Sequence, residues 1–155
     1  MGKYEMLASQ LGALMDGEND LIANLSNASA AIFESLDDVN WAGFYALKGD
    51  VLVLRPFQGK PACIRIPVGK GVCGTAIAKD EAQLVPNVHD FPGHIACDSA
   101  SNSEIVIPLH AGGEIVGVLD IDSPTVGRFS SEDLEGLRLC SKIIEKAWER
   151  SLNKN

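Results

Sequence analysis

Hydrophobic residues near the beginning of the chain recur every three or four positions, the spacing of amphipathic helices. This pattern predicts one helix over residues 4–15 and a second over residues 21–36, with a polar Gly-Glu-Asn-Asp break between them. Asn19 or Asp20 is available to cap the first turn of the second helix. Two helices therefore precede the first predicted strand.

Short apolar segments separated by turn residues follow, which is typical of β-strands. Strands are predicted over residues 39–47, 51–57, 83–88, 105–109 and 115–121, with a brief extended piece over 63–66. Lys-Gly-Asp at 48–50 and Ala-Gly-Gly-Glu at 111–114 are the turns of two hairpins. Residues 71–79 have the small-residue composition of a tightly packed helix, and Ser130 with Asp133 resembles a capping box before a closing helix.

The order of these elements predicts an α+β fold in a single domain, residues 1–155, with antiparallel hairpins and helices gathered on one face. Residues 86–103 form a polar stretch with two prolines and a glycine. Because this stretch is longer than an ordinary connection, it is predicted to be a functional lid or binding loop. Cys97 lies within it.

Composition excludes several classes of protein. The mean hydropathy of +0.07 and the 46% of hydrophobic residues are those of a folded globular chain. A net charge of -8 repels phosphate backbones, so we expect no nucleic-acid partner. Uninterrupted apolar runs are only a few residues long and no secretory signal is visible, so we expect no membrane span and a cytoplasmic location.

The strand that ends near residue 122 carries carboxylates. Because strand side chains alternate, Asp120 and Asp122 share one face, and Leu119 and Ile121 lie on the other. On spacing alone, the favoured interpretation is a solvated face, since Asp is rarely favoured in strands. The functional alternative is a pocket for a cation or an ammonium group. The hairpin could bring Glu104, at the start of the partner strand, toward the same end, although the sequence does not fix the register. Such a cluster would raise the pKa of at least one carboxyl group, as a proton donor near neutral pH requires.

An aromatic strand offers a second candidate surface. Trp41 and Tyr45 fall on one face of the predicted strand, and Gly43 between them is expected to leave open space. A small apolar group could then occupy that space. Ordinary core packing explains the same pattern equally well.

The four cysteines include no Cys-x-x-Cys motif, so neither a thioredoxin-type redox motif nor a zinc ribbon is expected. Cys140 lies on the apolar stripe of the last helix and is interpreted as a small buried hydrophobic residue. Cys73 lies at the predicted start of a helix, where the helix dipole favours a thiolate but tight packing among glycines favours an inert thiol. Cys63 and Cys97 lie in polar loops and are candidates for reactivity. His94 could hold a thiolate at Cys97, unless it is simply solvated.

Five segments together resemble the free methionine-R-sulfoxide reductases, which have a GAF fold. These segments are WAGFY at 41–45, FQGKPAC at 57–63, GKGVCG at 69–74, GHIACDSASNSE at 93–104 and GVLDIDS at 117–123. They follow the family's order and span most of the chain. The resemblance implies a GAF-like domain whose mostly antiparallel central sheet has the terminal helices packed on one face.

The resemblance also implies an activity, the reduction of free L-methionine-R-sulfoxide to L-methionine, with thioredoxin restoring the oxidised enzyme and no cofactor or metal required. By motif position, Cys97 is the nucleophile that becomes a sulfenic acid. Cys63 resolves it by forming a disulfide, and Cys73 is the family's third cysteine, with a role as secondary resolver or relay.

The substrate site follows from the same resemblance. Glu104, Asp120 and Asp122 match the family's substrate-site carboxylates, which polarise or protonate the sulfoxide oxygen and hold the amino group of the free amino acid. Trp41 is expected to face the S-methyl group, and Tyr45 to line the pocket. A homodimer is compatible with the sequence.

Two other hypotheses stay open. A GAF sensor would bind a small ligand without turnover, because the fold alone does not decide function, although 155 residues leave no room for an output domain. A thiol redox switch or metal site could instead form from Cys63, Cys73 and Cys97 with a histidine.

Overall fold

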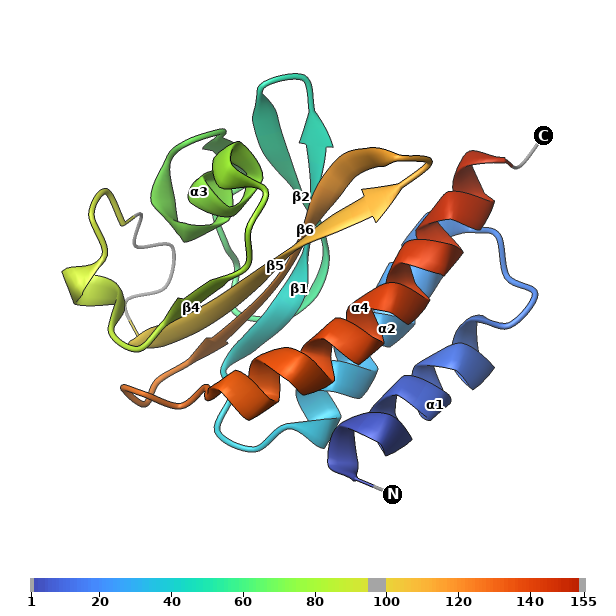
Figure 1. The fold of residues 1–155 in the computed structure, drawn as a ribbon, viewed down its shortest axis with the longest axis horizontal. Coiled ribbons are helices and arrows are strands. Elements are labelled where there is room, and N and C mark those ends of the chain that lie inside the picture. Colours follow the sequence, from blue (N-terminus) through green and yellow to red (C-terminus); the bar gives the residue numbers. More distant parts are fainter. Residues whose placement is uncertain (1, 95–99, 154–155) are drawn as a thin grey trace.

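The computed structural model of the protein describes residues 2–94 and 100–153. Its elements in chain order are α1 (Lys3–Met15), α2 (Leu21–Ser35), β1 (Trp41–Lys48), β2 (Val51–Gly59), β3 (Arg65–Pro67), α3 (Gly71–Lys79), β4 (Gln83–Val85), the 3-10 helix η1 (Val88–Asp90), β5 (Ser103–Ala111), β6 (Glu114–Ser123) and α4 (Ser131–Leu152). The strands form a 6-stranded sheet in the order β3-β2-β1-β6-β5-β4, within the described ranges. Neighbouring strands are antiparallel, which confirms the predicted α+β fold (Figure 1).

Two hairpins supply the central strands. β1 turns into β2 at Gly49, and β5 turns into β6 at Gly112 and Gly113, where the φ angles are 66, 63 and 81 degrees. Positive φ is strained for residues that carry a Cβ, so glycine makes these turns accessible. β1 then pairs with β6, and the two hairpins join into one sheet.

Three helices cover one face of the sheet (Figure 1). α2 and α4 pack on the strands, and α1 packs on both of these helices. The core between the helices and the sheet includes Phe44, Ile121 and Leu137, all with 0% exposure. This arrangement confirms the prediction that the terminal helices lie on one face.

The exception among the helices is α3, which lies on the opposite face of the sheet. Its residues Val72 and Ala76 form a second buried cluster with Val106 and Val118 of the sheet. These strand positions point away from the helical layer, so a second cover is needed to remove their apolar side chains from water. The helix spans the predicted residues 71–79, but its face could not be predicted from them.

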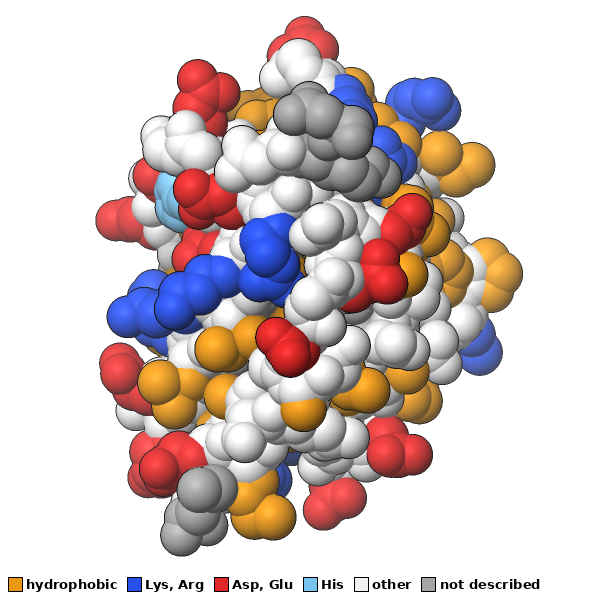
Figure 2. Space-filling model, turned by 90° about the vertical axis from the view of Figure 1, so that its right-hand side faces the viewer, with side chains coloured by type: hydrophobic (Ala, Val, Ile, Leu, Met, Phe, Trp, Pro, Cys, Tyr) orange, Lys and Arg blue, Asp and Glu red, His pale blue; other side chains and the backbone are white. Residues whose placement is uncertain are grey.

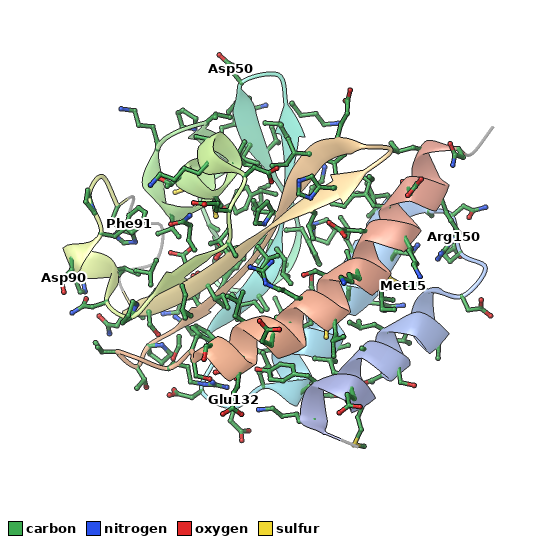
Figure 3. All side chains as sticks on the ribbon, in the orientation of Figure 1. Met15, Asp50, Asp90, Phe91, Glu132 and Arg150 are labelled. Atoms are coloured by element: carbon green, nitrogen blue, oxygen red, sulfur yellow. The ribbon has the colours of Figure 1, made fainter. Side chains whose placement is uncertain are left out.

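Element ends follow local signals. Asp20 caps α2 by accepting a hydrogen bond from the amide of Ala23 at 3.0 Å, and the predicted capping box forms at the start of α4. A contact between distant residues joins the ends of α1 and α4: the Arg150 guanidinium donates to the carbonyl of Met15, at 2.8 Å (Figure 3).

The predicted strand over 83–88 is shorter than expected. β4 ends at Val85, because Pro86 has no amide hydrogen to continue the ladder.

None of the helices in the described ranges is long and apolar enough to cross a membrane. Figure 2 shows the side of the molecule that lies to the right in Figure 1. Acidic side chains are spread over this face, and several Lys and Arg side chains form one short row between them. The negative net charge of the chain is therefore dispersed over this face rather than gathered in one patch.

Candidate active site

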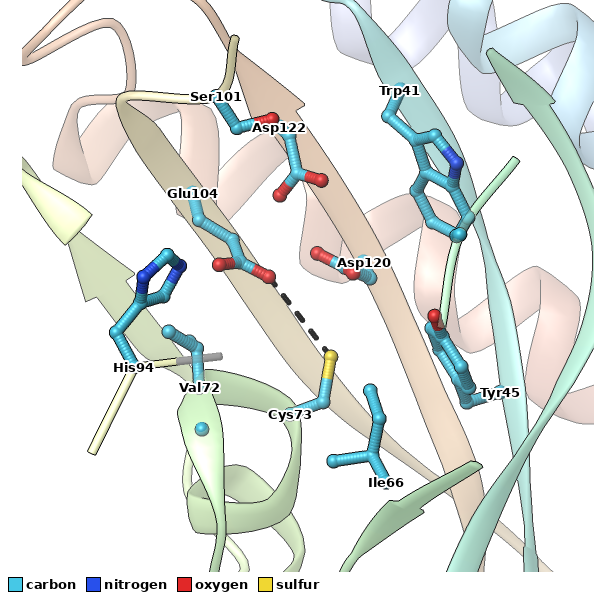
Figure 4. Close-up of a pocket in the computed structure, with 12 residues that line it drawn as sticks. Trp41, Tyr45, Ile66, Val72, Cys73, His94, Ser101, Glu104, Asp120 and Asp122 are labelled. Atoms are coloured by element: carbon cyan, nitrogen blue, oxygen red, sulfur yellow. Dashed lines mark hydrogen bonds between the residues drawn. The ribbon is translucent and has the colours of Figure 1, made fainter. Parts of the chain in front are cut away.

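A pocket lies beneath α3, at the start of β1 and β5 and the end of β6 (Figure 4). Its walls combine aromatic side chains, carboxyl groups and a thiol, which come from different elements. Six of the predicted site residues line it together: Trp41, Tyr45, Cys73, Glu104, Asp120 and Asp122. Cys63 lies in the adjoining loop, whereas Cys97 lies outside the described residues.

Strand register brings the three carboxyl groups together. Glu104 of β5 lies directly opposite Asp122 of β6, and Val106 lies opposite Asp120, so all three acids share one face. Glu104 is 8% exposed and Asp120 is 5% exposed. The favoured sequence interpretation, a solvated acidic face at Asp120 and Asp122, is therefore wrong for Asp120, and Asp122 is half-buried in the pocket wall, because α3 covers this face of the sheet.

Burial changes the proton affinity of these acids. Burial, followed by the nearby charges of Asp120 and Asp122, raises the pKa of Glu104 well above its ordinary value. Burial also raises the pKa of Asp120, although hydrogen bonds within the cluster oppose the shift. One oxygen of Asp120, Oδ1, is buried without a hydrogen-bond partner in the described part of the chain. The cluster can thus hold a proton near neutral pH and still offer an acceptor to a ligand.

Cys73 lies against this cluster from the first turn of α3. Its Sγ lies 4.0 Å from Oε2 of Glu104, and the residue is 3% exposed (Figure 4). Burial, followed by the charges of Asp120 and Glu104, raises the pKa of the thiol well above its ordinary value. The helix dipole that would favour a thiolate is outweighed, so Cys73 is a neutral hydrogen-bond donor here.

The sulfur of Cys73 and one oxygen each from Glu104 and Asp120 lie within 4.8 Å of one another. A metal ion would need such a set of atoms in deprotonated form. The raised pKa values of all three groups oppose that deprotonation. The raised pKa values therefore equip the cluster for proton transfer.

Aromatic residues form the wall opposite the acids. Trp41 and Tyr45 are each 2% exposed, with ring centroids 6.1 Å apart, and Trp41 also stacks on Phe57 at 5.1 Å. The expected open space at Gly43 is not there, because a Cβ at this position would lie 2.3 Å from the Cβ of Phe57. The strand β2 approaches so closely at a register irregularity that Gly43 is needed for packing.

Two further polar residues line the pocket. The pKa of His94 is lowered, first by burial and then by the charge of His89, so its imidazole is neutral near pH 7. Ser101 is 7% exposed, and its Oγ accepts a hydrogen bond from the side-chain amide of Asn40 at 3.3 Å. Sequence analysis did not select Ser101, because no periodic pattern marks a loop residue whose position depends on the fold.

Cys140 lies on the other side of the sheet, in the helical layer. It has 0% exposure, and burial raises the pKa of its thiol to about 11. Its interpretation as a small hydrophobic residue is confirmed by its place in the main core.

Comparison with known proteins extends these observations to the whole chain. The model of the GAF domain family matches residues 6–148. The free methionine-R-sulfoxide reductase of Escherichia coli (strain K12) is 57% identical over 143 residues, which cover 92% of this chain and 87% of that protein. The free methionine-R-sulfoxide reductase of Saccharomyces cerevisiae (strain ATCC 204508 / S288c) is 45% identical over 151 residues, covering 92% of this chain and 84% of that protein.

A solved structure agrees with these relatives. The free methionine-R-sulfoxide reductase from Neisseria meningitidis, in complex with its substrate, matches with a TM-score of 0.93 and 43% identity, covering 97% of this chain and 90% of that chain. The resemblance inferred from five short segments thus extends over nearly the full length of both proteins. The chain carries a GAF domain and belongs to the free methionine-R-sulfoxide reductases, a family of oxidoreductases.

Proposed function

We propose that this protein reduces free L-methionine-R-sulfoxide to L-methionine. The observation that best supports this activity is the burial of Glu104 and Asp120, two acids with raised pKa values, across the pocket from an aromatic wall. A sulfoxide oxygen is a poor leaving group until it is protonated, and a carboxyl group that keeps its proton near neutral pH can protonate it. The Neisseria meningitidis relative, a free methionine-R-sulfoxide reductase solved in complex with its substrate, supports the same substrate class.

Charge in the pocket supports a free amino acid as substrate. Three acids line the pocket, and no Lys or Arg does so among the described residues. A buried acidic cluster favours a ligand with a free ammonium group, which a peptide-linked methionine sulfoxide lacks. In this orientation the S-methyl group faces Trp41, and Tyr45 lines the pocket beside it.

The first chemical step uses Cys97, which matches the family's nucleophile by motif position. Its sulfur attacks the sulfoxide sulfur, and the oxygen passes to Cys97 as a proton is supplied to it. The substrate sulfur is reduced by two electrons and leaves as methionine, while Cys97 is oxidised to a sulfenic acid. The carboxyl cluster supplies the proton and holds the amino group.

Regeneration follows by thiol chemistry. Cys63 attacks the sulfenic sulfur, a disulfide with Cys97 forms, and the oxygen leaves as water. Thioredoxin then reopens the disulfide by exchange in the cytoplasm, where such thiols are kept reduced. We place this cycle in a single domain that includes residues 1–155, in a monomer or a homodimer. Cys73 is the third candidate thiol, but its burial and neutral form disfavour it as the first resolver.

The test measures methionine formed from the R and S epimers, each free and N-acetylated, by reduced protein. Turnover with a dithiol reductant is expected only for the free R epimer. Cys97→Ser should remove it by at least about 1,000-fold, whereas Cys63→Ser should still release about one methionine per chain and then stop recycling with thioredoxin. Cys140→Ala, which changes a cysteine outside the pocket, is the matched control and should keep wild-type turnover.

Two results would contradict the proposal. Equal loss of the first turnover in Cys97→Ser and Cys63→Ser would overturn the assigned roles of the two cysteines. A folded, reduced protein that turns over none of the substrates but binds a small ligand would favour the sensor hypothesis instead.

A further inference from the structure

Hydrogen bonds to its backbone carbonyls hold the loop that carries Cys63 against β1 and β2. This Cys63 loop, residues 60–64, connects β2 to β3, and Lys60, Pro61 and Ile64 are exposed. The carbonyl of Ile64 accepts a hydrogen bond from the amide of Leu54 at 2.9 Å. That bond ties the end of the loop to β2.

The other two anchors come from the aromatic wall of the pocket. The indole Nε1 of Trp41 donates to the carbonyl of Lys60 at 3.1 Å, and the hydroxyl of Tyr45 donates to the carbonyl of Cys63 itself at 2.9 Å. Both side chains start from β1 and line the pocket (Figure 4). Two residues that shape the substrate pocket therefore also fix the backbone of the Cys63 loop, at Lys60 and at Cys63.

The Tyr45 hydroxyl suits this role. Burial, followed by the charge of Asp120, raises the pKa of Tyr45, so the hydroxyl keeps its proton over the working pH range. The ring is held independently by its stacking with Trp41. The ring is thus packed without help from the hydroxyl, which donates its hydrogen bond to the carbonyl of Cys63.

We propose that Tyr45, assisted by Trp41, is a positioning residue for the disulfide-forming step, because its hydroxyl fixes the backbone of Cys63, the cysteine that attacks the sulfenic acid. This inference rests on the proposed function, in which Cys63 resolves the Cys97 sulfenic acid. Disulfide formation needs Cα atoms about 4.4–6.8 Å apart, so an unfixed Cys63 backbone would spend less time in a productive position. The substrate pocket and the Cys63 loop are therefore coupled through these two side chains.

The positioning of Cys63 affects the second chemical step, in which the disulfide forms. The Cys63 sulfur attacks the sulfenic sulfur of Cys97, the S–S bond forms, the S–O bond breaks, and the hydroxide leaves as water after taking the Cys63 proton. The sulfenic sulfur is reduced as Cys63 is oxidised. Loss of one hydrogen bond that positions Cys63 should slow this step about three- to tenfold.

The experiment compares Tyr45→Phe with wild type in a single turnover without reductant. Excess substrate first converts Cys97 to the sulfenic acid, and the reaction is quenched at intervals with a dimedone trap. Mass spectrometry then gives the fraction of sulfenic acid and of disulfide at each time. The rate of the second step is obtained from the decay of the trapped fraction, separately from any change in the first step.

Tyr4→Phe is the matched control, since it removes the hydroxyl of the other one of the chain's 2 tyrosines. The Tyr4 hydroxyl donates to Asp133 at 2.6 Å, in the helical layer. We expect longer-lived sulfenic acid in Tyr45→Phe and wild-type decay in Tyr4→Phe. Hydrogen exchange of the peptide that contains residues 60–64 should also increase in Tyr45→Phe alone, and this readout does not depend on activity.

The outcomes separate the two proposals. Wild-type decay of the sulfenic acid and wild-type exchange in Tyr45→Phe would overturn the positioning role while leaving Cys63 as the resolver. Methionine release by wild type without any disulfide to Cys63 would overturn both. If Tyr45→Phe is too unstable to assay, Trp41→Phe, which removes the anchor at Lys60, must slow the same step or the inference fails.

Discussion

The two faces of the sheet are built from alternate residues of the same strands, yet they have different roles. On β6, Leu119 and Ile121 lie in the helical layer with exposures of 1% and 0%, and Asp120 between them lies in the pocket at 5%. The face under α1, α2 and α4 is closed by apolar contacts. The face under α3 buries carboxyl groups and a thiol instead.

The comparison shows that one face of the sheet stabilises the fold and that the other face carries the reactive groups. Burial of apolar side chains on the helical face contributes to the free energy of unfolding, at roughly 1.5–3 kcal/mol for each large side chain. Burial of carboxyl groups on the pocket face opposes folding unless they are protonated or paired. Neighbouring positions of one strand can therefore be changed to affect either activity or stability with little effect on the other.

The largest effect is expected for Asp120→Asn on the pocket face. Loss of a carboxyl group from the acid cluster should lower kcat/KM by about 1,000-fold, within the range for general acid–base catalysis. The free energy of unfolding should be unchanged or higher, because a neutral amide replaces a buried acid. Steady-state kinetics and urea unfolding measure the two quantities.

Asp50→Asn, at an exposed position of the β1–β2 turn, is the control for that change. It should alter neither quantity. An Asp120→Asn protein that is fully active would remove this acid from the mechanism.

The reverse pattern is expected for Ile121→Ala on the helical face. A cavity in this fully buried site should lower the free energy of unfolding by about 3 kcal/mol. Activity per folded molecule should stay within about threefold of wild type, since the side chain points away from the pocket. Ile22→Ala, at a residue that is 53% exposed, should cost less than about 0.5 kcal/mol. A large loss of activity in folded Ile121→Ala would show that the two faces are not independent.

A smaller effect is expected on the pH dependence of the free energy of unfolding, through Glu104. Folding raises the pKa of Glu104. At a pH above the ordinary carboxyl pKa, the unfolded chain has therefore released this proton, whereas the folded protein still keeps it. The folded state then binds more protons, so the free energy of unfolding falls as pH rises from the ordinary carboxyl pKa toward the raised one. Glu104→Gln should flatten this fall and be more stable than wild type by on the order of 1 kcal/mol at pH 8.

Urea unfolding between pH 5 and pH 8 measures that slope. Glu149→Gln, at an exposed position of α4, should keep the wild-type pH dependence. If Glu104→Gln and wild type lose stability in parallel, Glu104 is ionised in both states and cannot be the proton donor.

Much of the local structure could be predicted from the residues themselves. The bounds of α3, the Asp20 cap, the Ser130 capping box and the two hairpin turns depend on contacts between residues close in the chain, and they were found where expected. The alternation of β6 likewise placed Asp120 and Asp122 on the face opposite to Ile121. Whole-chain similarity then confirmed the family that the motifs indicated.

The rest was decided by the tertiary structure. Alternation assigns side chains to a face but not what covers that face, so the acids looked solvated until α3 was found above them. Gly43 looked like an opening until β2 was seen to fill it. The sequence determined which groups share a strand face, because pleating is local. Only the fold decided their register, burial and proton affinity, because those depend on elements distant in the chain.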